Sequence, residues 1–129
     1  MKIIDCPCGT NKAYADCCEQ YLDGTATPAT AEALMRSRYT AYTLLQEEYL
    51  LATWHATTRP QQLGLAEDVS TKWLGLEVKR HIQQDDISAL VEFVARYKIG
   101  GSAHRMDETS RFVREDGRWF YVDGDIGES

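Results

Sequence analysis

The stretch ISALVEFVARYK, residues 87–98, decides the fold of this chain. Apolar side chains recur in it at every second position, which is the period of a strand with one buried face; they are Ile87, Ala89, Val91, Phe93, Ala95 and Tyr97. The segment that begins at Trp73 alternates in the same way, and its apolar positions are Leu74, Leu76, Val78 and Ile82. Because the turn-forming residues 84–86 separate the two segments, the pattern predicts a hairpin of two long strands.

Two further strands are predicted towards the C-terminus. The turn Gly100-Gly101-Ser102 leads into a strand over residues 104–114. Asp116-Gly117 is a strong hairpin signal, and the run Trp119-Phe120-Tyr121-Val122, aromatic at its first three positions, follows it. These aromatic side chains, together with Trp73, are expected to pack in the core and across strands. The second half of the chain therefore indicates an antiparallel meander.

Helical periodicity precedes the strands. Thr30 can cap a helix over residues 31–45, whose inward stripe would contain Leu34, Ser37 or Arg38, Ala41 and Leu45. A shorter helix is expected over residues 47–55, with Leu50, Leu51 and Trp54 inward. Residues 61–71 fit either a helical turn or an irregular loop. Helices followed by an antiparallel meander predict an α+β domain with the helices packed on one face of the sheet.

Size and charge restrict the classes of function. The chain has 129 residues, 43% of them hydrophobic, which suits one domain with a small appendage. Its net charge of −6 and pI near 5.0 disfavour nucleic-acid binding, because attraction to phosphates needs a basic face. No apolar stretch reaches the ~20 residues of a membrane helix, and the first residues lack the apolar run of a secretory signal. We therefore expect a cytoplasmic protein that does not enter membranes.

All four cysteines lie within residues 6–18, at Cys6, Cys8, Cys17 and Cys18. In a reducing compartment clustered cysteines bind metal more often than they pair, and disulfides here would constrain only the first turn. Four thiolates favour one structural zinc ion, with an iron–sulfur cluster or redox sensor as the alternative. Such a site leaves no open position for catalytic water. The chain thus divides into an N-terminal knob over residues 1–22, a linker over 23–29 and the α+β domain over 30–129.

The cysteine stretch resembles the SEC-C motif, the short zinc module named after the C-terminal tail of the SecA preprotein translocase. The positions that match it are Cys6, Cys8, Gly9, Lys12, Tyr14, Cys17 and Cys18. Asn11 replaces the usual turn glycine, and Ala15 replaces a usual basic residue. In the translocase the module binds a partner chaperone. The resemblance therefore implies a knob that presents a surface to a protein partner.

Blocks in the rest of the chain resemble the bacterial YchJ family. They are AEALMRSRY (31–39), TWH (53–55), TKWLGL (71–76), VEFVARY (91–97) and SRFVREDGRWFY (110–121). Together with the SEC-C motif they cover almost the whole chain. The resemblance implies a nuclear-transport-factor-2-like domain, in which a curved sheet wraps around helices to form a cystatin-like cone. It implies no reaction.

Cones of this kind often leave a cavity between helices and sheet, where a small molecule can bind. Glu92 would be a general base if it faced the cavity; otherwise it is an outward residue paired with Arg96 or Arg111. Arg111 could anchor a carboxylate or phosphate, or close an ion pair. The other pocket candidates, each of which has a structural role as its alternative, are Arg38, Tyr39, Trp54 and His55.

Two functions follow from these patterns. The one that we favour is a zinc-stabilised protein-interaction module fused to a cone-shaped domain. The alternative is a small-molecule-binding or catalytic cone with a pocket around Glu92 and Arg111. The sequence contains no nucleophile elbow, phosphate loop or nucleotide fingerprint, so no catalytic residue is assigned and an enzyme is disfavoured.

Overall fold

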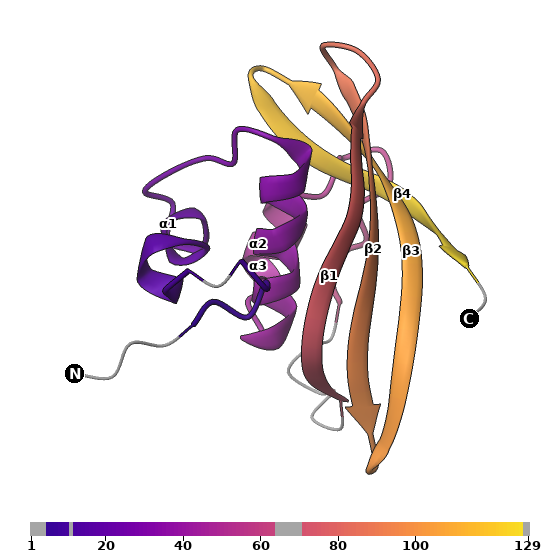
Figure 1. The fold of residues 1–129 in the computed structure, drawn as a ribbon. Helices are drawn as coiled ribbons and strands as arrows, with labels where there is room; N and C mark the ends of the chain where they lie inside the picture. Colours follow the sequence, from indigo (N-terminus) through magenta and orange to yellow (C-terminus); the bar gives the residue numbers. More distant parts are fainter. Residues whose placement is uncertain (1–4, 11, 64–70, 128–129) are drawn as a thin grey trace.

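The structure is a computed structural model that describes residues 5–10, 12–63 and 71–127. Its helices cover one face of a curved antiparallel sheet of four strands (Figure 1). The elements in chain order are η1 (Tyr14–Asp16), α1 (Glu19–Leu22), α2 (Ala31–Thr43), α3 (Glu47–Ala52), β1 (Thr71–Gln83), β2 (Ser88–Ile99), β3 (Ser102–Glu115) and β4 (Arg118–Gly127). This is the α+β architecture that the sequence predicts.

The sheet is a meander in the order β1-β2-β3-β4, and each neighbouring pair is antiparallel. The predicted hairpin of β1 and β2 is confirmed. The predicted turn at Asp116 and Gly117 is confirmed too, and both residues have a positive φ, of 52° and 78°. Positive φ at both turn positions matches the right-handed twist of the strands, so β3 and β4 are joined directly.

Two irregularities in β1 change which of its side chains face the helices. The register against β2 shifts once next to Leu74 and once next to Lys79. Each extra residue reverses the alternation of the strand. Leu76 is therefore buried under the helices, whereas Leu74 and Ile82 are exposed. The prediction that Leu74 and Ile82 share the buried face with Leu76 is wrong for this reason.

Helix α2 begins as predicted but ends early. The hydroxyl of Thr30 accepts a hydrogen bond from the amide of Ala33 at 3.0 Å, which caps the first turn. The helix ends at Thr43, and Leu45 then adopts a left-handed conformation with a φ of 57°. Its side chain is 48% exposed. Leu45 thus lies outside the buried stripe that the periodicity predicts for it.

Helix α3 is also shorter than predicted, because the chain after it pairs with β4. The carbonyl of Thr53 accepts from the amide of Tyr121 at 2.9 Å, and the amide of His55 donates to the carbonyl of Tyr121 at 2.7 Å. These bonds replace further helical turns, so α3 stops at Ala52. Residues 64–70, most of the segment without a clear pattern, lie outside the described residues.

The core lies between α2 and the sheet and continues into the N-terminal knob. Leu34, Val91 and Phe112 are almost completely buried, and the same cluster includes the four cysteines. The knob is therefore packed against the domain. No helix in the described part of the chain is long and apolar enough to cross a membrane.

Candidate metal centre and ligand pocket

The four cysteine sulfurs converge on one point. All four side chains are buried, their thiols are free, and the sulfur atoms lie within 4.8 Å of one another. Sγ of Cys17 lies 3.6 Å from Sγ of Cys8 and 4.0 Å from Sγ of Cys18. A tetrahedral site with metal–sulfur bonds of ~2.3 Å has sulfur–sulfur edges of ~3.8 Å. The donor set therefore fits one metal ion with four sulfur ligands.

A reversal of the backbone at Gly9 helps to bring the two cysteine pairs together. The amide of Cys6 donates to the carbonyl of Lys12 at 2.8 Å and closes the loop. Gly9 has a φ of +86°, and a Cβ at this position would lie 2.7 Å from the carbonyl oxygen of Leu76 in β1. Glycine meets both requirements, because it tolerates positive φ and has no Cβ. The same turn thus folds the cysteine loop and docks it on the sheet.

The adjacent residues Cys17 and Cys18 reach the same point because the backbone bends between them. Neighbouring side chains on a continuous helix diverge by ~100°. Cys17 follows η1 and has non-helical angles (φ −126°, ψ −104°), whereas Cys18 precedes α1 with helical angles (φ −75°, ψ −22°). The bend removes the divergence, as the sequence requires if both sulfurs bind one ion.

Helix α2 also holds the knob, through Arg36 and Thr40. Nη1 of Arg36 donates to the carbonyl of Cys8 at 2.6 Å, and its Nε pairs with Glu32 at 3.0 Å. The hydroxyl of Thr40 lies 3.6 Å from Sγ of Cys6. Residues 36 and 40 are four positions apart and form one ridge of the helix. The sulfur cluster is therefore braced by α2 along a full helical turn.

Because the sulfurs lie close together, the pKa values of the thiols shift in opposite directions. The pKa of the Cys8 thiol is lowered to about 4, chiefly by its hydrogen bond with Cys18. The same contact, together with burial, raises the pKa of Cys18, and burial raises the pKa of Cys17. Metal ligation requires thiolates, so a metal ion that binds here would release protons, and acid would oppose its binding.

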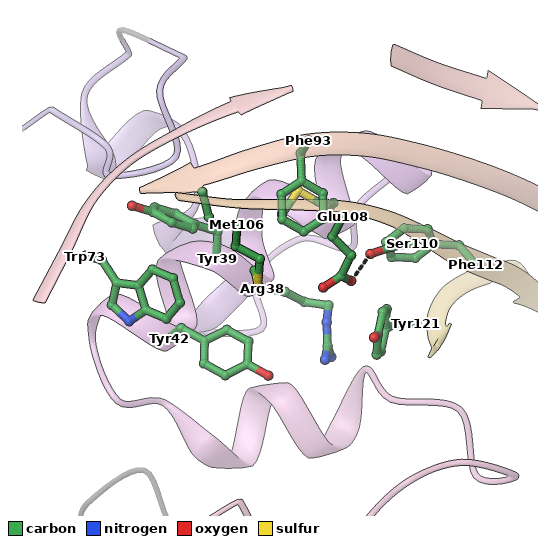
Figure 2. Close-up of a pocket in the computed structure, with 12 residues that line it drawn as sticks. Arg38, Tyr39, Tyr42, Trp73, Phe93, Met106, Glu108, Ser110, Phe112 and Tyr121 are labelled. Carbon is green, nitrogen blue, oxygen red and sulfur yellow. Dashed lines mark hydrogen bonds between the residues drawn. The ribbon is translucent and has the colours of Figure 1, made fainter. Parts of the chain in front are cut away.

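A cavity of about 270 Å³ lies between α2 and the inner face of the sheet (Figure 2). Its apolar lining comes from α2 and from three of the strands, and consists of Met35, Trp73, Phe93, Ala95, Met106 and Phe112. Its polar lining consists of Arg38, Tyr39, Tyr42, Glu108, Ser110 and Tyr121. A mostly apolar cavity with a few converging polar groups is typical of a small-molecule site.

Arg38 brings a buried positive charge to the edge of this cavity. The side chain is 5% exposed, and its Nη1 donates to the carbonyl of Leu50 at 2.8 Å and to the hydroxyl of Thr53 at 2.6 Å. The guanidinium lies 4.6 Å from the ring centre of Tyr121 and 5.1 Å from that of Trp54. Burial lowers the pKa of Arg38, but a guanidinium stays protonated in proteins. Its charge is therefore fixed.

Glu108 places a carboxylate in the same cavity. The hydroxyl of Ser110, itself 2% exposed, donates to Oε2 of Glu108 at 2.5 Å. The carboxylate lies over Gly124 of β4, where a Cβ would overlap it. Figure 2 shows the Glu108 carboxylate and the Arg38 side chain directed into the same space. The cavity therefore contains one charge of each sign.

The phenols around the cavity are held in the neutral form. Burial raises the pKa of Tyr39 to about 12, and it also raises the pKa values of Tyr42 and Tyr121. At neutral pH each hydroxyl can therefore donate a hydrogen bond.

Glu92 does not line this cavity. It lies on the sheet face that carries no helix among the described elements, where its carboxylate is 3.8 Å from Nε of Arg80. Strand parity is the reason, since the neighbouring Phe93 points into the cavity and successive side chains alternate. Glu92 instead borders a shallow hollow on the outer face.

Arg111 also points away from the cavity. Its Nε donates to Asp123 at 2.5 Å, and its Nη1 donates to Asp125 at 2.8 Å, on the outer face of β4. The neighbouring Phe112 occupies the inner face. The structure thus corrects the expected pocket: its charged residues are Arg38 and Glu108, in place of Glu92 and Arg111.

The remaining sequence candidates divide between the cavity and its surroundings. Arg38 and Tyr39 line it, and Trp54 stacks on the guanidinium of Arg38. His55 lies elsewhere, with Nε2 against the carboxylate of Glu115 and Nδ1 2.7 Å from the hydroxyl of Thr57. Since α3 ends three residues before His55, these contacts take the place of the expected interaction with a helix end.

Sequence reasoning missed Tyr42, Glu108 and Ser110. The available signal is the two-residue period that places Glu108 and Ser110 on the same face as Met106 and Phe112. In a single sequence, polar residues at this period indicate a solvent face, so the half-buried carboxylate of Glu108 could be recognised only through its apolar neighbours.

Comparisons with known proteins cover both parts of the chain. Residues 5–20 match the SEC-C motif, and residues 30–124 match the family described as YchJ, middle NTF2-like domain. The UPF0225 protein RSc0270 of Ralstonia nicotianae is 58% identical over 131 residues, which cover 94% of this chain and 90% of that protein. A UPF0225 protein of Chromobacterium violaceum is 60% identical over 123 residues, covering 92% and 90%.

Two solved structures have the same fold. The solution structure of RPA3114, a SEC-C motif containing protein from Rhodopseudomonas palustris, is 33% identical and superposes with a TM-score of 0.87 over 97% of this chain and 100% of that one. The crystal structure of a SEC-C motif containing protein from Psychrobacter arcticus is 30% identical, with a TM-score of 0.81 over 97% and 84%.

Proposed function

The chain belongs to the YchJ (UPF0225) family, and we propose that it is a small-molecule-binding protein whose cone is braced by a structural zinc ion. The observation that carries this proposal is the cavity under α2, where Arg38 and Glu108 meet apolar walls. A buried cation and a half-buried carboxylate that do not contact each other cost folding free energy. A ligand that contacts both would offset that cost.

Binding is favoured over catalysis for two reasons. The four sulfurs would complete the coordination of a metal ion, so no position remains for an activated water. The cavity lining pairs one hydroxyl with one carboxylate, Ser110 with Glu108, but among the described residues it adds no histidine or lysine to activate that hydroxyl.

Zinc is the metal that the sulfur cluster suits best, because four thiolates at tetrahedral spacing are its usual structural ligands. Bound zinc would cross-link the cysteine loop and hold it against α2 and β1. Metal analysis of purified protein should find one zinc ion per chain and no visible absorbance. Iron with absorbance in the visible range would overturn the assignment in favour of an iron–sulfur cluster. Four free thiols also suit the cytoplasm, where we place the protein.

The binding proposal can be tested with a variant that fills the cavity. Ala95 is 1% exposed and lines the cavity, so Ala95→Leu would occupy part of its volume. Ligand-observed NMR with a set of aromatic fragments should detect binding to the wild-type chain and lose it in Ala95→Leu. Thr109→Leu, on the outer face of β3, is the matched control and should keep it. Equal fragment binding by Ala95→Leu, or no binding at all by the wild type, would overturn the proposal.

A second candidate function is the docking of a protein partner on the knob. The observation in its favour is a group of exposed charged side chains around the buried sulfurs, which includes Lys12, Asp16 and Glu19. Such a rim can engage a partner while the metal stays enclosed. In a pull-down from cell extract, Asp16→Lys combined with Glu19→Lys should lose the partners that the wild-type chain retains. An unchanged set of partners would remove this function.

A further inference from the structure

Neither charge in the cavity forms a salt bridge with another residue that the structure describes. The Arg38 guanidinium forms no salt bridge with any described carboxylate, although Glu108 lies in the same cavity. Nη1 of Arg38 donates two hydrogen bonds, to Leu50 in α3 and to Thr53, the residue after that helix. The cation is thus anchored on one side, and on the other no carboxylate of the described residues pairs with it.

The carboxylate of Glu108 is held in a fixed position. Ser110 binds it from within β3, and its side chain runs across Gly124 in β4, where any larger residue would displace it. A residue on the opposite face of the same strand behaves differently, since Asp107 pairs with Arg105 at 3.1 Å. Glu108 is therefore positioned by its neighbours to present its free oxygen to the cavity.

The walls between these charges are aromatic. Trp73 lies edge to face against Tyr39, with ring centres 5.6 Å apart at 75°. Phe112 and Tyr121 are tilted at 66° with centres 5.8 Å apart. The volume of about 270 Å³ exceeds the ~150 Å³ of an apolar protein cavity that accommodates benzene. The cavity thus has room for one aromatic ring together with polar substituents.

We infer that the ligand is a small aromatic zwitterion, with an anionic group bound by Arg38 and a cationic amine bound by Glu108. This inference rests on the proposed binding function and specifies its ligand class. An aromatic acid would pair with Arg38 and leave Glu108 unpaired, and an aromatic amine would do the reverse. A molecule with both groups pairs both charges and keeps the cavity neutral. Its binding therefore leaves the least desolvation free energy uncompensated.

Three probes with the same ring separate these cases. Phenylalanine carries both charged groups, 3-phenylpropanoate lacks the amine, and 2-phenylethylamine lacks the carboxylate. Their dissociation constants can be measured with the full zinc-loaded chain by NMR chemical-shift titration. Phenylalanine should bind at least about tenfold more tightly than either of the others, because each charged hydrogen bond contributes on that scale. Equal or weaker binding of phenylalanine would overturn the inference.

Matched variants identify the residue that selects the amine. Glu108→Gln keeps the shape of the side chain and should weaken phenylalanine binding about tenfold, while leaving 3-phenylpropanoate binding unchanged. Asp107→Asn, one residue away on the outer face, should change neither. Loss of affinity for both probes in Glu108→Gln, or for neither, would overturn the role of Glu108.

The failure of this inference differs from the failure of the proposed function. If other aromatic fragments bind and Ala95→Leu abolishes their binding, while phenylalanine has no advantage, the cavity is a binding site and the zwitterion assignment is wrong. If no aromatic fragment binds to the wild-type chain, both are wrong.

Discussion

The sulfur cluster and the cavity lie on different sides of the same helix, but they are assembled in different ways. The cluster is made by residues 6–18 and touches α2 through Arg36 and Thr40. The cavity takes its charged lining from Arg38 in α2 and Glu108 in β3, seventy positions apart. Each side of α2 thus uses its own ridge of residues four positions apart. A local site survives small changes of register, whereas a site assembled across a sheet depends on every strand facing the right way.

Breaking the cluster should have the largest effect. Cys8 is fully buried and its sulfur contacts Cys17, so Cys8→Ser removes a ligand from the centre of the site. We expect loss of the metal and of several kcal/mol, roughly 3 or more, in the free energy of unfolding, because metal binding energy here is folding energy. Metal analysis and thermal unfolding measure both.

A chelator provides the control for this substitution. It should lower the unfolding temperature of the wild-type chain towards that of Cys8→Ser and leave the variant unaffected. If the wild-type chain stays metal-free and equally stable, the cluster is not a structural centre.

Weakening the contact between the knob and the sheet should have the next largest effect. Gly9→Ala forces a Cβ to within 2.7 Å of the Leu76 carbonyl oxygen at a φ of +86°. Gly24→Ala is a matched control, because Gly24 has nearly the same φ (+85°) and nothing within 4 Å of an added Cβ. Both variants lose ~1 kcal/mol or more to backbone strain, and Gly9→Ala should lose a further ~1–3 kcal/mol to the clash. Urea unfolding measures the difference, and equal losses would mean that the knob does not dock on β1.

Alkaline pH should lower the stability of the fold through Tyr39, which lies on the cavity side of α2. Burial raises the pKa of Tyr39 from its ordinary value near 10 to about 12. The folded state therefore holds the proton more tightly than the unfolded state, so the stabilisation is complete below pH 10 and is lost as the pH rises towards 12. Tyr39→Phe removes this ionisation. Between pH 10 and 12 the free energy of unfolding of the variant should therefore fall less steeply than that of the wild type, by up to ~1.4 kcal/mol per pH unit. Unfolding measured between pH 9 and 12 tests this, and parallel curves for the two chains would contradict it.

The contrast between the local cluster and the cavity assembled across the sheet also explains which features the sequence could predict. The cysteine spacing predicts the cluster, because all four ligands and the bend between Cys17 and Cys18 lie within one short segment. The strands and the first turn of α2 were predictable from their periods and from the cap at Thr30. The exposure of Leu74 could not be predicted. Each of the two register shifts in β1 reverses which side chains face the helices, and the apolar pattern of the strand does not indicate them.

The cavity was only partly predictable. Arg38 and Tyr39 were among the candidates because they interrupt an apolar helix. Glu108 was missed, because a polar residue in an alternating strand indicates solvent unless the packing of the whole sheet is known. Glu92 is a candidate for the complementary reason, since it interrupts the most apolar strand. The structure bears out its outward-facing alternative, with Arg80 as the partner in place of Arg96 or Arg111.

A substitution at Glu92 should have the smallest effect, and it tests whether the outer face of the sheet takes part in ligand binding. Glu92→Gln removes a charge from the outer face of β2, where Arg80 lies 3.8 Å away and both side chains are well exposed. An exposed pair at this distance contributes little to stability, so the unfolding midpoint should stay within measurement error of the wild type. Binding of aromatic fragments should also stay unchanged, since the sheet separates Glu92 from the cavity.

The informative comparison is with Glu108→Gln, because the two glutamates lie on neighbouring strands and on opposite faces. Both substitutions remove one negative charge, so long-range electrostatic effects are nearly equal and any difference reports the face of the sheet. NMR titration of the two variants with phenylalanine should show a loss of affinity for Glu108→Gln alone. A comparable loss in Glu92→Gln would place the ligand on the outer face and would remove the cavity from the function of this protein.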